Sequence, residues 1–433
     1  MQRLNPKPFL TRAAALAGMV AIVSCCVQAG AAQTENWPRW RGPQDNGSAT
    51  TGGYPVKWET NSVLWKVRLP GKGCSTPIVW NQRIYLTAPT NGMDAALAFD
   101  WSGKPLWLTT FDKEQPGKHR NGSGSNPSAA TDGETLAVYF KSGTLAALDM
   151  DGKVRWQTNL VTAFGPENLF WDQGTSPVLT RRDVVFARMH HGESWVAAFD
   201  KKTGALRWKA ARNYETPVEG DNAYTTPVVI EHEGKEALLI WGGQHVSAHD
   251  ASNGEVFWWC GDFNPKQTGY WPQVASPVTG KGVVVVASGR SDKGQPRFYG
   301  VKLGGKGDVT KSHKLWTRED TGTFVPTPAE YKGLIYLLRD RGEIECLDPE
   351  TGKKVWSDAL PKASSNFYSS PAVAGGNLYA IREDGAVFVA KVEGGYELLN
   401  ETTMGERVIA SPVAVANRLL IRGDKHLFCI GEK

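Results

Sequence analysis

Residues 176–208 read SPVLTRRDVVFARMHHGESWVAAFDKKTGALRW, and this stretch decides the fold. After the Ser176-Pro177 pair, short apolar runs alternate with polar residues or are β-branched, and Gly, Asp, Asn or Pro bounds each run. Such runs are typical of β-strands, whereas a helix needs a longer segment with a 3.6-residue period. The stretch therefore predicts a unit of four short strands.

The same unit recurs along the chain, and its marker is a small residue followed by proline. Successive marker prolines are 50, 50, 50, 50, 51, 43 and 41 residues apart. A period of this length indicates one supersecondary unit that stacks on its neighbours. The eight marker pairs are Thr76-Pro77, Asn126-Pro127, Ser176-Pro177, Thr226-Pro227, Ser276-Pro277, Thr327-Pro328, Ser370-Pro371 and Ser411-Pro412.

The two ends of the chain complement each other. The eighth unit stops after Phe428-Cys429-Ile430, one strand short, while residues 63–66 (VLWK) look like a fourth strand without the first three. A circular array closed by strands from both termini leaves no exposed end repeat, unlike a linear solenoid. We therefore predict an all-β, eight-bladed β-propeller of four-stranded blades, closed by strands from both termini.

Two further residue types mark most units. An Asp followed by Gly within three to four residues predicts a tight turn, since the carboxylate can accept backbone N–H groups and Gly can take a positive φ. One Trp in the fourth strand can fill the wedge between neighbouring sheets. Unit five departs from the pattern because Gly304-Gly305-Lys306-Gly307 stretches it, and unit seven has Tyr396 where a Trp is expected.

The first 31 residues predict a signal peptide. Three basic residues and no acid precede an eleven-residue apolar run, 13–23, and Ala29-Gly30-Ala31 fits a cleavage site. An alternative stays open, because residues 22–25 (IVSC) resemble a lipobox, which would make Cys25 a lipid anchor. The run is too short to span a bilayer. We expect a periplasmic or extracellular protein, either free or anchored as a lipoprotein, with no transmembrane span.

Charge and cysteine usage restrict the partners. The formal net charge is +5, and the leader holds three of the basic residues, so the exported chain carries about +2. This charge provides no field for binding phosphate backbones, so we expect no nucleic-acid partner. We also expect a monomer. The remaining cysteines are interpreted as buried thiols, with disulfides permitted but not indicated; they are Cys74, Cys260, Cys346 and Cys429.

The repeat resembles a known family. Residues 145–156 read LAALDMDGKVRW, and similar segments end at other tryptophans of the series. They resemble the quinoprotein-type (PQQ-like) propeller repeat over about residues 62–433. This family includes eight-bladed quinoprotein alcohol dehydrogenases and the non-enzymatic BamB-type lipoproteins of outer-membrane β-barrel assembly. The resemblance implies the fold and leaves the function open.

The dehydrogenase alternative implies pyrroloquinoline quinone (PQQ) and calcium in the central funnel, often beside an adjacent-cysteine disulfide. Here the only adjacent cysteines, Cys25-Cys26, lie in the leader, and units of about 50 residues leave little room for substrate-pocket insertions. The Asp149-x-Asp151-Gly152 turn lacks the glutamate of an EF-hand at its twelfth position. Signatures of esterases, P-loop hydrolases and zinc proteases are absent from the sequence. We nominate no catalytic residue and no metal ligand, and we expect PQQ and calcium only under this alternative.

The segments before the marker prolines form the candidate site. By repeat equivalence they should all surround one mouth of the central channel, and they combine aromatic anchors with polar groups, as binding sites do. A plainer interpretation is that their aromatics cover blade edges. The candidate residues are Arg120, Asn121, Trp171, Asp172, Asn222, Tyr224, Trp271, Gln273, Phe324, Tyr368 and Arg407.

Between the leader and the propeller lies a predicted arm, residues 32–61. Its segment 37–47 (WPRWRGPQDNG) resembles a motif of exported propellers, and two interpretations stay open: a tail packed on the propeller, or a lid or partner-docking segment. Our favoured function is an exported non-catalytic scaffold that binds a protein or polymer partner in the cell envelope through one channel mouth. The alternatives are a small PQQ-dependent dehydrogenase and a carbohydrate-binding protein.

Overall fold

The computed structural model describes residues 1, 35–50, 52–58, 62–217, 219–267 and 271–432. The chain divides into two compact units, 1–33 and 34–433, and only the second is described below. The predicted signal peptide and the Cys25 anchor therefore lie outside the described residues. Within the described part, the structure contains no helix that is long and apolar enough to cross a membrane.

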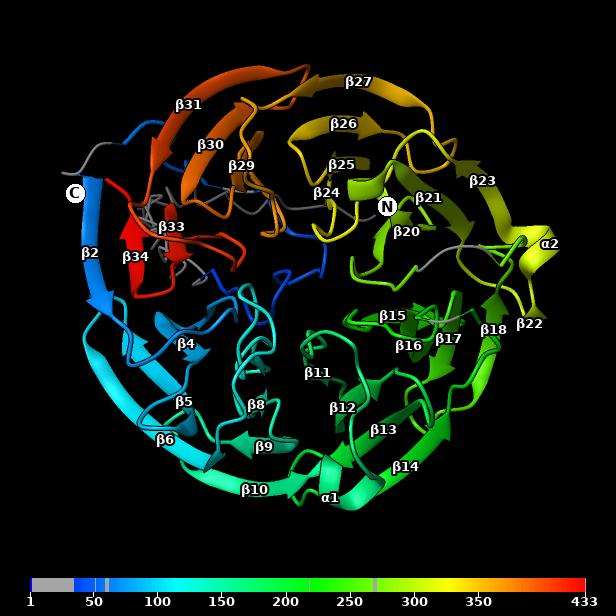
Figure 1. Ribbon diagram of the computed structural model, residues 1–433, viewed down its shortest axis with the longest axis horizontal. Coiled ribbons are helices and arrows are strands. Elements are labelled where there is room, and N and C mark those ends of the chain that lie inside the picture. Colours follow the sequence, from blue (N-terminus) through cyan, green and yellow to red (C-terminus); the bar gives the residue numbers. More distant parts are fainter. Residues whose placement is uncertain (2–34, 51, 59–61, 218, 268–270, 433) are drawn as a thin grey trace. The chain divides into compact units, whose positions relative to one another are not determined.

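Residues 34–433 form eight sheets around one central axis, which confirms the predicted eight-bladed β-propeller (Figure 1). In seven blades the four strands follow one another in sequence, innermost strand first, and in all eight blades these strands pair antiparallel. Blades 1 to 4 contain, in order, β3 (Ile78–Trp80), β4 (Arg83–Thr87), β5 (Met93–Asp100), β6 (Pro105–Lys113); β7 (Ala130–Thr131), β8 (Leu136–Tyr139), β9 (Thr144–Leu148), β10 (Val154–Asn159); β11 (Val178–Leu179), β12 (Asp183–Arg188), β13 (Trp195–Asp200), β14 (Leu206–Ala211); β15 (Val228–His232), β16 (Lys235–Gly242), β17 (His245–Asp250), β18 (Val256–Cys260).

Blades 5 to 8 continue the pattern. They contain, in order, β19 (Val278–Gly280), β20 (Val283–Arg290), β21 (Gln295–Lys302), β23 (Lys314–Arg318); β24 (Ala329–Tyr331), β25 (Leu334–Leu338), β26 (Glu343–Leu347), β27 (Lys354–Ala359); β28 (Ala372–Ala374), β29 (Asn377–Ile381), β30 (Ala386–Lys391), β31 (Glu397–Thr403); β32 (Val413–Val415), β33 (Arg418–Arg422), β34 (His426–Ile430), β2 (Val63–Arg68). Two short strands extend blades in parallel, β1 (Ser48–Ala49) beside β28 and β22 (Gly307–Asp308) beside β18. The described helical segments are α1 (Leu160–Phe164), η2 (Ser291–Lys293) and α2 (Thr310–His313).

The last blade closes the circle as predicted. Strand β2 from the start of the chain pairs antiparallel with β34 from its end, with Val63 opposite Ile430 and Arg68 opposite His426. The prediction that residues 63–66 supply the missing fourth strand is therefore confirmed.

The tryptophans of the outer strands join neighbouring blades. The indole N–H of Trp156 in blade 2 donates to the carbonyl of Lys201 in blade 3 at 2.9 Å, and the ring packs on Gly204 of the same turn. The predicted wedge-filling role is thus confirmed, with a hydrogen bond in addition. The same arrangement joins four more pairs of blades. In each, the indole N–H donates to a carbonyl of a turn in the next blade at 2.8–3.1 Å, and the ring packs on the glycine of that turn. The tryptophans and glycines are Trp65 and Gly103, Trp107 and Gly152, Trp208 and Gly254, and Trp316 and Gly352.

This arrangement breaks where the sequence departs from its repeat. The indole nitrogen of Trp258 in blade 4 is buried and has no partner among the described residues. Here the inserted segment Gly304–Gly307 returns to the edge of β18 and pairs with it in parallel, with Gly307 opposite Trp258. In blade 7, the ring of Tyr396 packs 6.2 Å from Trp356, and its hydroxyl donates to the carbonyl of Ala359.

The predicted Asp turns are confirmed as structural. Asp200 Oδ1 accepts hydrogen bonds from the backbone N–H groups of Lys202 and Thr203 at 3.0 and 2.9 Å. Equivalent bonds form at Asp100, Asp149, Asp250 and Asp348.

A closed ring of hydrogen bonds surrounds the channel at the start of the innermost strands. One residue of each blade donates its backbone N–H to the hydroxyl of the equivalent residue in the next blade, at 2.9–3.2 Å, and Ser411 of blade 8 returns the chain of bonds to Thr76 of blade 1. We call this the hydroxyl ring. Its members are Thr76, Ser128, Ser176, Thr226, Ser276, Thr327, Ser370 and Ser411, all buried.

The ring corrects one detail of the repeat. Its member in blade 2 is Ser128, which follows Pro127, whereas the other members precede their prolines. Asn126-Pro127 is therefore not equivalent to the other marker pairs, and the even 50-residue spacing on either side of it is a coincidence of sequence.

Removing one hydroxyl tests how much the ring stabilises the fold. We expect Ser176→Ala to lower the free energy of unfolding by about 1–3 kcal/mol, because the buried N–H of Ser128 loses its acceptor. Ser176→Thr should be nearly neutral, since threonine supplies the same hydroxyl at three other ring positions. Urea unfolding monitored by circular dichroism measures both; equal midpoints for wild type and Ser176→Ala would show that the ring bond contributes nothing.

The arm packs inside the propeller, in agreement with the packed-tail interpretation. Trp37 exchanges two 2.8 Å backbone hydrogen bonds with Val79 of β3, and its side chain is 1% exposed. Arg41 donates to the carbonyl of Pro328, and β1 extends blade 7. The arm thus contacts innermost strands of several blades, and Figure 1 shows it running through the middle of the ring of sheets.

Candidate functional site

The central channel contains a pocket with a volume of about 350 Å³. Residues of the hydroxyl ring line it, among them Ser176, Ser370 and Ser411. Trp40 of the arm also lines it, and its indole N–H donates to Ser411 Oγ at 3.3 Å. The arm therefore closes the inner end of the channel, and the pocket opens at the mouth formed by the segments between blades.

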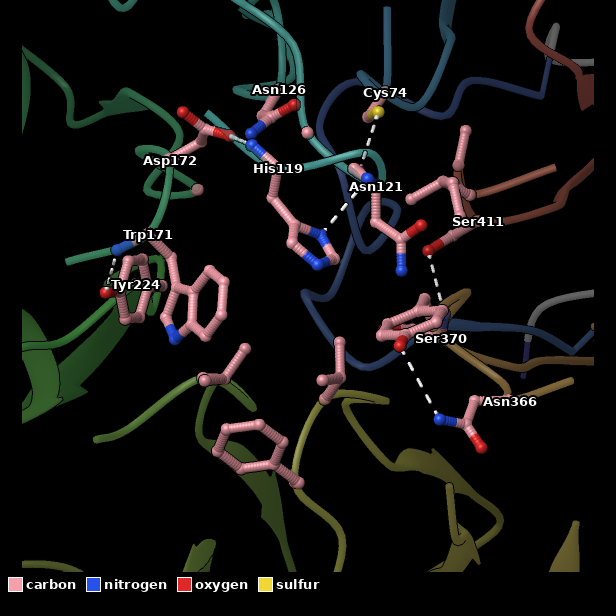
Figure 2. A pocket seen from close by; sticks show the side chains of 18 of the residues that line it. Cys74, His119, Asn121, Asn126, Trp171, Asp172, Tyr224, Asn366, Ser370 and Ser411 are labelled. Atoms are coloured by element: carbon pink, nitrogen blue, oxygen red, sulfur yellow. Dashed lines mark hydrogen bonds between the residues drawn. The ribbon is translucent and has the colours of Figure 1, made fainter. Parts of the chain in front are cut away.

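Six of the eleven predicted residues line this pocket. Figure 2 shows Trp171 and Asn121 directed toward the same open space, with His119 between them. The structure brings together Asn121, Trp171, Asp172, Tyr224, Phe324 and Tyr368. Whether these residues bind a ligand stays a prediction.

Asp172 lines the pocket, but its carboxylate is hydrogen-bonded to neighbouring loops. Its buried carboxylate accepts a 2.6 Å bond from Lys141 Nζ and further bonds from the backbone N–H groups of Lys118 and His119. All of these partners belong to other segments of the mouth. This carboxylate therefore fixes the position of His119 and is not free for a ligand.

Tyr224 also has a structural hydroxyl. Its oxygen accepts the backbone N–H of Trp171 at 2.9 Å, which orients the neighbouring loop, and burial raises the pKa of this phenol. The ring of Trp171 lies edge-on to His119, with centroids 5.0 Å apart. Tyr224 and His119 thus hold Trp171 at the pocket wall.

Three predicted residues lie beneath the surface and outside the pocket lining. Gln273 is fully buried; its Nε2 donates to the carbonyl of Trp271 at 2.5 Å, and its backbone N–H donates to the carbonyl of Asn222 at 3.1 Å. The guanidinium of Arg297 lies over the Trp271 ring at 5.1 Å. For these residues the plainer interpretation applies, because they connect adjacent loops.

The last two predicted residues form a charged group on the rim. Both Arg120 and Arg407 approach the carboxylate of Glu383, with N···O distances of 3.4 and 3.7 Å. The carbonyl of Arg120 also accepts hydrogen bonds from Arg407 Nη1 and Lys72 Nζ. This cluster ties blades 1, 7 and 8 together beside the pocket, and the Arg120 side chain stays largely exposed.

The sequence-based prediction missed part of the lining, which comes from turns between the second and third strands. Arg290 ends β20 and Asp292 follows it; the two form two 2.8 Å bonds, which raise the pKa of Arg290, and the guanidinium lies 4.4 Å from the Phe324 ring centroid. Asp340 follows β25 and accepts from Ser291 Oγ and from the N–H of Phe324, while burial raises its pKa. Because strands alternate in direction, these turns reach the same face as the segments before the innermost strands, and this rule would have found them.

Cys74 differs from the expectation of a buried strand thiol. It lies in the loop before β3, is partly exposed, lines the pocket, and its Sγ is 3.3 Å from the carbonyl of Asn121. Cys260, Cys346 and Cys429 are buried in strands, and all four are free thiols in the described structure.

The described lining offers calcium no free carboxylate. Calcium takes six to eight oxygen ligands, mostly free carboxylates and carbonyls. The pocket carboxylates of Asp172, Asp292 and Asp340 are each engaged by protein donors. Among the residues that the structure describes, no group of three or more His, Cys, Asp or Glu side chains could hold a metal ion.

The fold and the pocket define a class: PQQ-type eight-bladed β-propellers with a recess at one channel mouth. The family model described as outer membrane protein assembly factor BamB matches residues 47–260 and 192–431, and the chain belongs to this family. It is 22% identical to the outer membrane protein assembly factor BamB of Yersinia pestis over 354 residues, which are 80% of this chain and 70% of that protein.

Solved structures share the fold. BamB from Moraxella catarrhalis superposes with a TM-score of 0.61 at 15% identity, covering 86% of this chain and 97% of that one. Quinohemoprotein alcohol dehydrogenase from Comamonas testosteroni superposes with a TM-score of 0.66 at 15% identity, covering 94% of this chain and 82% of that one. At these identities the likeness concerns the fold alone.

Proposed function

We propose that the protein is an exported, non-catalytic scaffold of the cell envelope that binds a partner of outer-membrane protein assembly through its mouth face. Membership of the BamB family is the observation that carries this proposal. The mouth supports it, because its carboxylates are engaged in holding loops, so the described pocket offers a shaped surface and no free carboxylate that could act as a general base.

The exposed residues of the mouth suit a partner surface. Phe170 is 58% exposed and packs edge-on against Trp171, with ring centroids 4.8 Å apart, and the Arg120 side chain is also largely exposed on the rim. Aromatic residues and arginine are enriched among the residues that dominate binding energy in protein interfaces. A rigid disc with such a rim can hold a partner without changing its own shape.

Site-specific photo-crosslinking in the producing cell tests this proposal. A photoreactive residue at Phe170 is expected to yield adducts with a protein of the outer-membrane assembly machinery, identified by mass spectrometry. The matched control is Glu350, an exposed residue of a turn on the opposite face. Equal adducts from both positions, or none from Phe170, would contradict a partner-binding mouth.

The second candidate is a small PQQ-dependent dehydrogenase. The likeness to the alcohol dehydrogenase fold and the position of a pocket in the central channel favour it. Adding PQQ with calcium and following cofactor absorbance and dye reduction distinguishes the two functions. Stoichiometric absorbance with dye reduction would support the dehydrogenase, and neither is expected for a scaffold.

A further inference from the structure

The pocket presents neutral hydrogen-bond donors that the protein does not use. Nδ1 of His119 accepts the backbone N–H of Asn121 at 3.2 Å, so a neutral imidazole carries its hydrogen on Nε2. Figure 2 shows this ring directed into the open space. The neighbouring ring of Trp171, whose centroid lies 5.0 Å from that of His119, has an indole N–H with no acceptor among the described residues either.

The inner end of the pocket adds hydroxyl donors. Ring members such as Ser176, Ser370 and Ser411 accept a backbone N–H each, but none of them donates its own proton to an acceptor among the described residues. A hydroxyl that has accepted one bond can still donate one. The lining therefore has unused donors on its walls and at its inner end.

Two amide side chains strengthen this pattern. Both amide atoms of Asn121 are shielded from solvent without a partner in the described structure, and the same holds for Oδ1 of Asn366. A shielded polar group without a partner lowers the stability of the folded state, so such groups in a folded protein require a reason. An amide is both donor and acceptor, which suits a ligand that also has both.

Charge restricts the ligand further. The carboxylates of Asp172, Asp292 and Asp340 line the pocket, and each is already paired or hydrogen-bonded. A cation would find no free carboxylate there. An anion would meet three acidic groups and only Arg290, which Asp292 already binds. A neutral ligand therefore fits best.

Aromatic rings complete the lining, since Trp171, Tyr224, Phe324 and Tyr368 contribute to its walls. A sugar ring has faces of C–H groups that pack on aromatic rings and an edge of hydroxyls that donate and accept. From the neutral donors, the unpaired amides and the aromatic walls, we infer that this pocket binds one pyranose ring of a neutral saccharide. The inference is independent of the partner proposed above, which would contact the outer rim.

Calorimetric titration of the exported chain with neutral saccharides tests this site. The probes are cellobiose, maltose and N,N′-diacetylchitobiose, with glucuronate and glucosamine as charged counterparts. At least one neutral probe should bind at a single saturable site, at least tenfold more tightly than both charged sugars. No saturable binding at tens of millimolar, or tighter binding of a charged sugar, would overturn the inference.

Two variants locate the site. Trp171→Ala should weaken the binding of the neutral probe at least tenfold, whereas Trp101→Ala, which removes a tryptophan side chain outside the pocket lining, should leave it unchanged.

Asn121→Leu should also weaken binding at least tenfold and leave the melting temperature unchanged or higher, because it replaces unpaired polar atoms by an apolar group of similar shape. Binding that survives both pocket substitutions would overturn the assignment, and so would a lower melting temperature for Asn121→Leu, which would show that the amide stabilises the fold. Crosslinking at Phe170 is a separate measurement, so the two proposals can fail independently.

Discussion

Replacing Trp37 with alanine is expected to lower the free energy of unfolding by about 3–5 kcal/mol, the range for large aromatic side chains removed from a core. Trp37 lies in the arm, yet its side chain is 1% exposed and packs among Leu69, Val79, Ile84 and other core residues of blades 1 and 8. Its indole N–H donates to the carbonyl of Trp40, so the change would also loosen the residue that closes the pocket.

Equilibrium unfolding in urea measures the loss. Phe170→Ala is the control, because that side chain is 58% exposed and its removal should cost little. A Trp37→Ala midpoint equal to that of the control would mean that the arm is only a docking segment laid on the surface, and the packed-tail interpretation would then be wrong.

The second large effect is expected at a turn that receives a tryptophan. Gly204→Ala should lower the free energy of unfolding by about 2–5 kcal/mol, from two causes. Gly204 has φ +72°, where an L-residue costs roughly 1–2 kcal/mol, and a Cβ would lie 2.6 Å from Cδ2 of Trp156, where overpacking typically costs a further 1–3 kcal/mol.

Gly282→Ala separates the two causes. Gly282 has nearly the same φ, +73°, but a Cβ there would meet nothing within 4 Å. It should show the conformational cost alone. If both variants unfold at the same urea concentration, the contact between Trp156 and the turn of blade 3 does not contribute to the junction between blades.

Much of the fold could be predicted because its signals are local. Each Asp turn depends on bonds between residues two to four positions apart, as at Asp200, and each strand shows its apolar run directly. Because the same pattern of turns and strands recurs in eight units, a pattern that is weak in one unit became decisive for the whole chain. The error at Pro127 shows the limit, since sequence spacing favoured Asn126-Pro127, while the hydroxyl ring is completed by Ser128.

The candidate site could be predicted only in part. Repeat equivalence placed six of the eleven residues at the pocket, but it could not tell Trp171, which faces the space, from Trp271, which lies buried under Arg297. Both stand in equivalent segments and have the same chemistry. The difference depends on which neighbour each side chain meets, and those neighbours are distant in sequence.

The sequence by itself determined the number of blades, the strand that closes the circle, and the turns and tryptophans that join the blades, because residues within one period specify these features. Tertiary structure alone decided that the arm closes the inner end of the channel, that Asp172 is bound by Lys141, and that the side-chain amide of Asn121 is left without a partner among the described residues. The hydroxyl ring makes the reason plain: its last bond joins Ser411 to Thr76, 335 positions apart, and only a closed circle brings them together.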